Sequence, residues 1–242
     1  MPTSGASNFR LNQAIAKSGM YSRRQADLLI EAGRVSVNGK TVTDFSTTVD
    51  PLIDTVSVDG KPLDIRPFVY IAMYKPRGLV TTCADEKGRR SVMDLLPERL
   101  RHLRPVGRLD MNSEGLLIFT NDGDLTQRVT HPAHHLPKRY LVTVKGQIKD
   151  SHLNVLAGGM VLSDGPTQPA RVVLIERTPA ASTFEIVIRE GRNRQIRRMC
   201  AQLGYQVSRL VRLAIGRLQL GEMRPGAWRY LTAHEIRQLE PD

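Results

Sequence analysis

The stretch VGRLDMNSEGLLIFTNDGD, residues 106–124, decides how the larger part of the chain folds. Its apolar run, residues 116–120, ends at the turn signal Asn121-Asp122-Gly123, and a short apolar run bounded in this way predicts a buried strand. Asp110 stands just before that strand, on a polar loop between two glycines. Loops carried by rigid strands are where chemistry is usually placed. Asp110 is therefore a candidate catalytic carboxylate, although a surface ion pair with Arg108 explains it more simply at this point.

The composition limits the class of protein. A chain of 242 residues suits one large domain, or a small domain followed by a medium one. No apolar run approaches the roughly 18 residues that a membrane helix requires, and the N-terminus lacks the apolar region of a secretory signal. Two distant cysteines provide neither a disulfide framework nor zinc spacing. We expect a cytoplasmic protein without membrane contact.

The charge of the chain indicates its partner. The net charge is +11 and the pI is about 10.1, which predicts a polyanion, RNA or DNA before a membrane. Residues 189–224 contain nine arginines and two glutamates, and no lysine follows Lys149. Lysine would serve solubility equally well, whereas arginine binds phosphate bidentately and stacks on bases. The bias therefore favours nucleic-acid recognition.

Residues 10–65 predict a small module of two helices followed by a β-meander. The second helix begins at Ser22, and Gln25 completes its capping box. Alternating residues around Asn38-Gly39 predict a hairpin, and Val56-Ser57-Val58 adds a further strand.

This module is rich in basic residues and resembles the S4 RNA-binding module over residues 10–40, RLNQAIAKSGMYSRRQADLLIEAGRVSVNGK. Two arginines fall in the first turn of its second helix, where cations oppose the helix dipole. A phosphate bound there would relieve that conflict. We place an S4-like domain at residues 8–62 and a linker at 63–67. Its predicted RNA contacts are Arg10, Arg23, Arg24, Arg34 and Lys40.

The larger domain, residues 68–240, predicts several strands of two-residue periodicity with few helices between them. Such a pattern is typical of an α+β fold, here a mostly antiparallel sheet with flanking helices. The predicted strands are residues 69–74, 79–82, 138–144, 170–176, 183–189 and 210–216. The predicted helices are residues 125–130 with Asp124 as N-cap, 151–158, 194–203 with Asn193 as N-cap, and a last one that opens at Thr232.

The segment GRNRQIRRMCAQLG, residues 191–204, predicts an amphipathic helix with one buried stripe, made of Ile196, Met199, Cys200 and Leu203. Arg197 falls at the edge of that stripe. Because an unpaired buried charge is costly, it needs a carboxylate partner. Arg194 and Arg198 point away from the stripe and stay free for phosphates.

Four motifs together resemble the bacterial ribosomal RNA pseudouridine synthases of the RsuA family. They are GRLDMNSEGLLIFTNDGDL, KRYLVTV, EGRNRQIRRM and LVRLAIGRLQL, in this order from Gly107 to Leu220. An S4 module in front is the usual arrangement in that family. The resemblance covers the chain from about Arg10 to Glu240, and four ordered motifs are far more specific than any one of them.

The resemblance implies roles for individual residues. Asp110 would be the catalytic carboxylate, Tyr140 would stack on the target base, and Arg197 would pair with Asp110. Leu210 would pack beneath the base, with Arg108 beside it in the base pocket. Arg192, Arg194 and Arg198 would contact the RNA.

The implied reaction detaches uracil from C1′, turns it, and rejoins it through C5. It involves no redox change and loses no group, so we expect no cofactor. It requires a carboxylate near C1′, which an arginine partner would keep ionised. Extracting the base from its stack costs a few kcal/mol, and arginines on the flanking phosphates would offset that cost. Whether Asp110 attacks C1′ or takes a proton from C2′ stays open.

Several alternatives remain at this point. A non-catalytic S4-type protein would predict loss of Asp110 or its arginine, a methyltransferase would want a glycine-rich loop, and a glycosidase would pair Asp110 with Glu114. The histidines of 131–135 lack further ligands at metal spacing, so no metal is expected. Asp164-Gly165-Pro166 and GRNRQIRRM resemble the large-subunit members of the family more than the small-subunit ones, and this resemblance implies 23S rather than 16S RNA. We expect a monomer that acts on naked RNA, an assembly intermediate or a ribosomal subunit.

Overall fold

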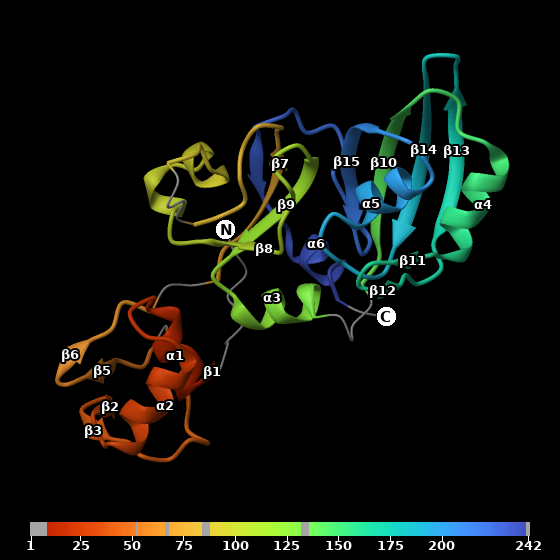
Figure 1. The fold of residues 1–242 in the computed structure, drawn as a ribbon. Helices are drawn as coiled ribbons and strands as arrows, with labels where there is room; N and C mark the ends of the chain where they lie inside the picture. The colour runs from red at the N-terminus through yellow and green to blue at the C-terminus, as the bar shows by residue number, and fades with distance from the viewer. Residues whose placement is uncertain (1–8, 52, 66–67, 84–87, 132–135, 241–242) are drawn as a thin grey trace. The chain divides into compact units, whose positions relative to one another are not determined.

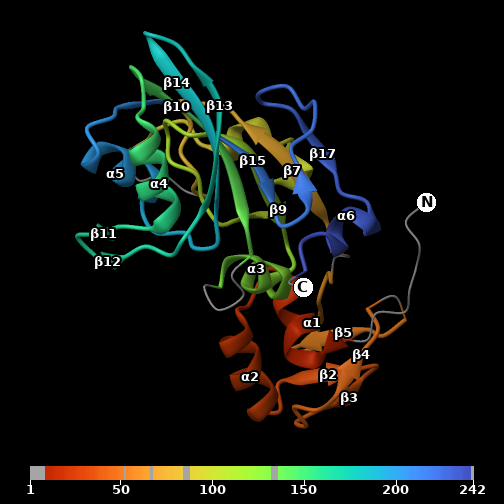
Figure 2. The same ribbon diagram turned by 90° about the vertical axis from the view of Figure 1, so that its right-hand side faces the viewer.

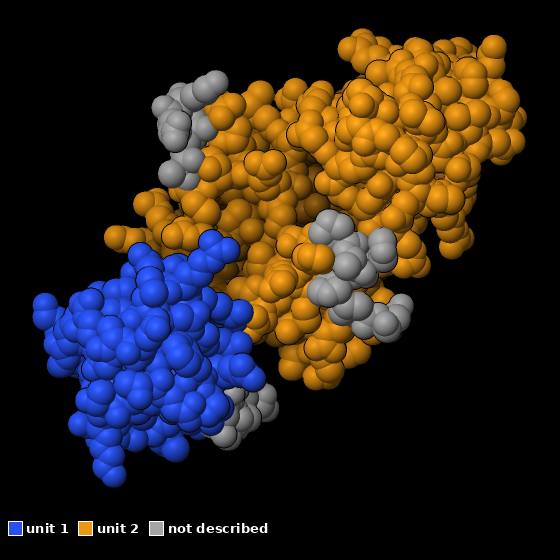
Figure 3. Space-filling view, turned by 60° about the horizontal axis from the view of Figure 1, so that its bottom comes forward, with its two compact units in different colours: residues 1–68 blue, residues 69–242 orange. Residues whose placement is uncertain are grey.

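The computed structural model describes residues 9–51, 53–65, 68–83, 88–131 and 136–240 (Figure 1). It divides into two compact units, residues 1–68 and 69–242 (Figure 3). Phe68, predicted to open the larger domain, belongs to the first unit, where its ring packs edge-on against Phe9 with 5.2 Å between the ring centroids.

The first unit has the predicted order of two helices followed by small strands. Its core comes from both helices and from four buried valines of the strands. The Ser22–Gln25 capping box is formed. Leu63 and Ile65 pack against this core, so the predicted linker begins within the unit. The elements are β1 (Phe9–Arg10), α1 (Leu11–Lys17), α2 (Arg23–Glu31), β2 (Val35–Val37), β3 (Lys40–Thr41), β4 (Thr48–Val49), β5 (Val56–Val58) and β6 (Lys61–Pro62).

The second unit is built on a nine-stranded sheet in the order β13-β14-β10-β15-β9-β7-β17, with β16 beside β15 and β8 beside β9. All its strand pairs are antiparallel except β15–β9, so the predicted mostly antiparallel α+β fold is confirmed. The strands are β7 (Tyr70–Lys75), β8 (Arg104–Val106), β9 (Glu114–Thr120), β10 (Lys138–Lys145), β13 (Arg171–Arg177), β14 (Ala181–Ile188), β15 (Val207–Ile215), β16 (Leu218–Gln219) and β17 (Trp228–Tyr230).

The parallel pairing of β9 with β15 depends on Gly115. This residue stands opposite Arg212, with φ +110°. A Cβ on Gly115 would lie 2.3 Å from the carbonyl oxygen of Arg212. Only glycine therefore allows the two strands to approach at this point.

Helices cover both faces of the sheet. On β9, Leu116 and Ile118 face one core while Leu117 and Phe119 face the opposite one, which explains the unbroken apolar run of this strand. Helices α4 and α5 both lie against the β10–β14 part of the sheet (Figure 2). The helices are η1 (Val92–Leu95), η2 (Glu98–Leu100), α3 (Gly123–Thr130), α4 (Asp150–Gly158), α5 (Gln195–Gln202) and α6 (Ala233–Arg237), and β11 (Val161–Leu162) with β12 (Gly165–Pro166) forms a separate hairpin. Within the described ranges, no helix could cross a membrane.

Three local predictions were wrong. Residues 79–82 form no strand. Val80 makes only an isolated bridge to Ser91, and the hydroxyl of Thr81 bonds the backbone of Leu109. The N-cap of α3 is Asp122, whose Oδ1 accepts from two backbone amides. The N-cap of α5 is Arg194, in a left-handed conformation with φ +48°.

Candidate active site

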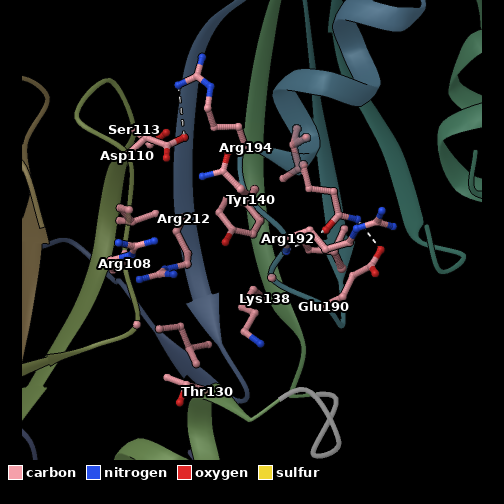
Figure 4. Close-up of a pocket in the computed structure, with 18 of the residues that line it drawn as sticks. Arg108, Asp110, Ser113, Thr130, Lys138, Tyr140, Glu190, Arg192, Arg194 and Arg212 are labelled. Atoms are coloured by element: carbon pink, nitrogen blue, oxygen red, sulfur yellow. Dashed lines mark hydrogen bonds and ion pairs between the residues drawn. The ribbon is translucent and has the colours of Figure 1, made fainter. Parts of the chain in front are cut away.

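A cavity of about 520 Å³ opens between the loop at 106–113, the strands β10 and β15, and the segment 188–196 (Figure 4). This volume is within the usual range of small-molecule sites. Its described lining has six basic residues, Arg108, Lys138, Arg189, Arg192, Arg194 and Arg212, and two acidic ones, Asp110 and Glu190.

The loop that carries Asp110 is fixed through its backbone. Every carbonyl oxygen from residue 109 to residue 113 accepts a hydrogen bond. In chain order the donors are Thr81 Oγ1 at 2.8 Å, Ser113 N at 3.0 Å, Gly78 N at 2.8 Å, Arg197 Nη2 at 2.8 Å and Lys75 Nζ at 2.8 Å. A loop with all its acceptors occupied has little freedom to move, so it holds the attached side chain in one place.

Lys75, at the end of β7, is fully buried beneath this loop. Its ammonium donates to the carbonyls of Ser113 and Pro76, at 2.8 and 3.0 Å. Burial lowers the pKa of Lys75 to about 8, while the charges of Asp110 and Glu114 act in the opposite direction. A buried cation with a displaced pKa beside a cavity is typical of a functional site.

The carboxylate of Asp110 has few partners, in contrast to the backbone of its loop. Its Oδ2 lies 3.7 Å from Nη1 of Arg194, and the side chain is 31% exposed. Within the described residues no hydrogen bond reaches this carboxylate. The carboxylate is therefore open to the cavity, on a loop whose backbone is fixed.

Arg197 was predicted to pair with Asp110, but in the structure Arg194 forms that ion pair. Arg197 donates instead to the backbone carbonyls of Asn112 and Val207 and to the hydroxyl of Ser113. Burial and the charge of Arg194 lower the pKa of Arg197, and the charge of Asp110 raises it. The left-handed N-cap brings Arg194 to the cavity, whereas Arg197 faces the loop backbone.

Tyr140, Leu210 and Arg212 line the cavity from two neighbouring strands. Tyr140 on β10 stands opposite Arg212 on β15, and Leu210 lies two residues along β15 on the same face. Leu210 is 6% exposed and Tyr140 is half-buried. An aromatic face and an aliphatic surface therefore line the same cavity as Asp110. The exposed Arg108 also lines the cavity.

Two further predicted RNA contacts, besides Arg194, are engaged within the second unit. Arg192 and Arg198 both bind the carboxylate of Asp164, in the turn of the β11–β12 hairpin. These arginines hold the pKa of Asp164 well below its usual value. The prediction that Arg194 and Arg198 stay free of partners was therefore wrong.

In the first unit, the predicted RNA contacts are mostly exposed. This holds for Arg10, Arg23, Arg24 and Lys40. Arg34 is exposed as well, but it makes a two-point ion pair with Asp59, with Nε–Oδ1 at 2.8 Å and Nη2–Oδ2 at 2.5 Å.

Sequence reasoning missed four cations of the site, Lys75, Lys138, Arg189 and Arg212. For two of them a signal existed, because two-residue alternation along a strand puts Arg212 on the same face as Leu210 and Lys138 on the same face as Tyr140. Lys75 carried no comparable signal. Among the described residues no group of His, Cys, Asp and Glu could hold a metal, and His134 and His135 lie outside them.

Comparison with known proteins identifies the family. A family model described as RNA pseudouridylate synthase matches residues 69–202, and an S4 domain model matches residues 9–51. This chain belongs to the RNA pseudouridylate synthase family. The family predicted from the four motifs is confirmed, and so is the pseudouridine synthase class of enzyme.

This synthase resembles its relatives over nearly its whole length. It is 41% identical to an uncharacterized RNA pseudouridine synthase of Mycobacterium leprae, over 97% of this chain and 93% of the relative. It is 38% identical to ribosomal large subunit pseudouridine synthase B of Bacillus subtilis, over 95% of each. A crystal structure of a pseudouridylate synthase, 31% identical, covers 96% of this chain and 99% of its own, with a TM-score of 0.69.

Proposed function

We propose that this synthase converts specific uridines of 23S ribosomal RNA to pseudouridine, with Asp110 as the catalytic carboxylate. The observation that carries the assignment is the contrast at residues 109–113. The backbone there is bonded at every carbonyl, while the carboxylate keeps a single ion pair and opens into a cavity that Tyr140 and Leu210 also line.

The geometry supports a reaction on a uridine turned out of its RNA stack. The uracil packs between the Tyr140 ring and the Leu210 side chain, which hold it without fixing its orientation. Asp110 acts on the ribose, by addition at C1′ or by removing a proton from C2′. The N1–C1′ bond breaks, the base turns, and C5 bonds to C1′. The C5 proton then leaves to solvent and N1 takes up a proton from solvent, so the product is an isomer of uridine. Atoms and electrons balance without a cofactor.

The relatives support the choice of RNA. Ribosomal large subunit pseudouridine synthase B of Bacillus subtilis and that of Salmonella typhimurium are each 38% identical to this chain. The exposed arginines of the S4 unit supply cations for phosphates outside the cavity. The proposed enzyme acts as a monomer in the cytoplasm.

The test is release of tritium from [5-³H]uridine-labelled 23S and 16S transcripts. The proteins are the wild type, Asp110→Asn, and Asp150→Asn as a matched control. Asp150 on α4 pairs with Arg177 on β13, and neither residue lines the cavity. We expect release from 23S RNA by the wild type and the control only. Release from 16S RNA alone would overturn the assignment to 23S RNA. Activity of Asp110→Asn would overturn the catalytic role of Asp110. RNA binding by the wild type without any release would indicate a non-catalytic RNA-binding protein.

A further inference from the structure

Two cations of the cavity have no carboxylate to neutralise them. Among the described residues neither Lys138 nor Arg212 forms an ion pair. The two acids of the lining are engaged elsewhere. Asp110 pairs with Arg194, and Oε1 of Glu190 accepts from the backbone amide of Gln168 at 3.0 Å.

Both cations are partly or wholly removed from water. Arg212 is 5% exposed. Its Nε donates to the carbonyl of Leu116 at 2.7 Å, but its Nη2 is buried without a hydrogen-bond partner. Burial, then the charge of Arg212, lower the pKa of Lys138. Two neighbouring desolvated like charges are an unfavourable arrangement, which a bound anion would relieve.

The position of Lys138 and Arg212 in the cavity indicates which anion they bind. In Figure 4, Lys138 lies at the opposite end of the cavity from Asp110, with Tyr140 between them. Lys138 and Tyr140 are two residues apart on β10 and both line the cavity, a separation of roughly 7 Å. A base held on Tyr140 thus leaves the backbone beside it within reach of Lys138. Neutral uracil oxygens would need only neutral donors, so two unpaired cations favour phosphate.

We propose that Lys138 and Arg212 form a phosphate subsite at the floor of the cavity, which binds a backbone phosphate adjacent to the target uridine. The inference rests on the proposed function and extends it. It assigns the nucleotide's charged group to one end of the cavity and its reacting carbon to the other. Positioning of this kind can supply a large share of a rate enhancement.

A first experiment needs no catalysis. Inorganic phosphate is titrated against chloride at constant ionic strength, and Tm is followed for the wild type, Lys138→Gln and Lys145→Gln. Lys145 is the matched control, because it is an exposed lysine on the same strand that does not line the cavity. We expect phosphate to raise Tm of the wild type and the control, with most of the rise lost in Lys138→Gln. Equal shifts in all three proteins would overturn the subsite.

A second experiment identifies the group on the RNA. Once the target uridine is mapped, oligonucleotides are made with a neutral methylphosphonate on its 5′ or its 3′ side. We expect one of the two methylphosphonate oligonucleotides to lower kcat/KM of the wild type by about tenfold. On that oligonucleotide the wild type and Lys138→Gln should have the same kcat/KM. If Lys138→Gln still loses activity on both oligonucleotides, the lysine contacts the base and the inference fails. Arg212→Lys serves as a second variant that keeps the charge.

The two proposals fail separately. If the wild type releases no tritium from any RNA, the proposed function is wrong, and the phosphate titration still decides the subsite. If the wild type is active and Lys138→Gln equals it in kcat/KM and in its phosphate response, only the subsite is wrong.

Discussion

Two carboxylates of this synthase face arginines from the same short segment, residues 192–198, and they are treated differently. Asp164 binds both Arg192 and Arg198, the latter with Nη1 and Nη2 at 2.8 and 3.0 Å. Asp110 has one ion pair at 3.7 Å, to Arg194. The hairpin carboxylate has its hydrogen-bonding capacity well filled, and the cavity carboxylate does not.

The difference fits a joining role for Asp164 and the reacting role that we propose for Asp110. Asp164 fastens the β11–β12 hairpin to the start of α5, and for this purpose more hydrogen bonds are better. A carboxylate that reacts must exchange partners along the way, so bonds that stabilise only its resting state slow it. In Asp110 the rigidity therefore comes from the loop backbone and leaves the oxygens available.

The largest expected effect separates these two carboxylates. We expect Asp110→Asn to lower kcat for tritium release by at least about 10³-fold, with the fold retained. Asp164→Asn should cost only a few-fold, chiefly in KM, because it loosens the arginine segment without touching the reacting atoms. Single-turnover rates and circular dichroism of both variants test this. Comparable losses in kcat would erase the distinction.

The next effect concerns the two arginines near Asp110. Arg194→Gln should lower kcat by about 30-fold, equivalent to about 2 kcal/mol, because it removes the ion-pair partner, with stability little changed. Arg197→Gln should instead destabilise the fold by about 1–3 kcal/mol, because it removes the donor of three hydrogen bonds that join α5 to the Asp110 loop and to β15. Urea unfolding and kcat are measured side by side. A large loss in kcat for Arg197→Gln at unchanged stability would restore the pairing that the sequence resemblance implied.

A smaller effect depends on pH. The pKa of Lys75 is lowered to about 8 from the 10.5 of a free lysine. Between these values the unfolded state holds more protons, so this group makes stability rise with pH. Activity should move the opposite way and fall several-fold above pH 8, as the ammonium beneath the Asp110 loop loses its charge. In Lys75→Met that alkaline limb should vanish from the pH profile of kcat. A limb that persists would come from another group.

The smallest expected effect is on the salt dependence of RNA binding, and it distinguishes an arginine without a carboxylate partner from one that has such a partner. Arg24 is exposed on α2 and has no carboxylate partner among the described residues. Arg24→Gln should therefore reduce the slope of log Kd against log salt by about 0.7–1. Arg198→Gln should change it less, because Asp164 already neutralises that arginine. Filter binding across a salt series measures both slopes, and equal changes would mean that RNA displaces Asp164.

Local pattern was a good guide where neighbours along the chain decide the structure. The capping boxes at Ser22 and Thr232 follow from residues three positions apart, and both are formed. Alternation along β14 correctly predicted a strand with every second residue buried. Asp110, Tyr140 and Leu210 were found through motifs and do line one cavity.

Pattern failed where partners are distant. The pairing of Asp110 depends on the left-handed φ of Arg194, a non-glycine conformation that propensity does not predict. The role of Arg197 depends on the carbonyl of Asn112, 85 residues away in the chain. Such outcomes belong to tertiary contacts rather than to local sequence.

The single parallel pairing also sets an order of assembly. Strands β9 and β15 meet at only two residue pairs, and the bond from Arg212 to Leu116 spans 96 residues of chain. Contacts of such sequence separation carry a high loop-closure cost and form late. The β7–β9 half and the β10–β14–β15 half have more local pairings and can form first. Asp110 belongs to one half and Tyr140 to the other. Under the proposed function, catalytic competence should therefore appear only with the last folding phase.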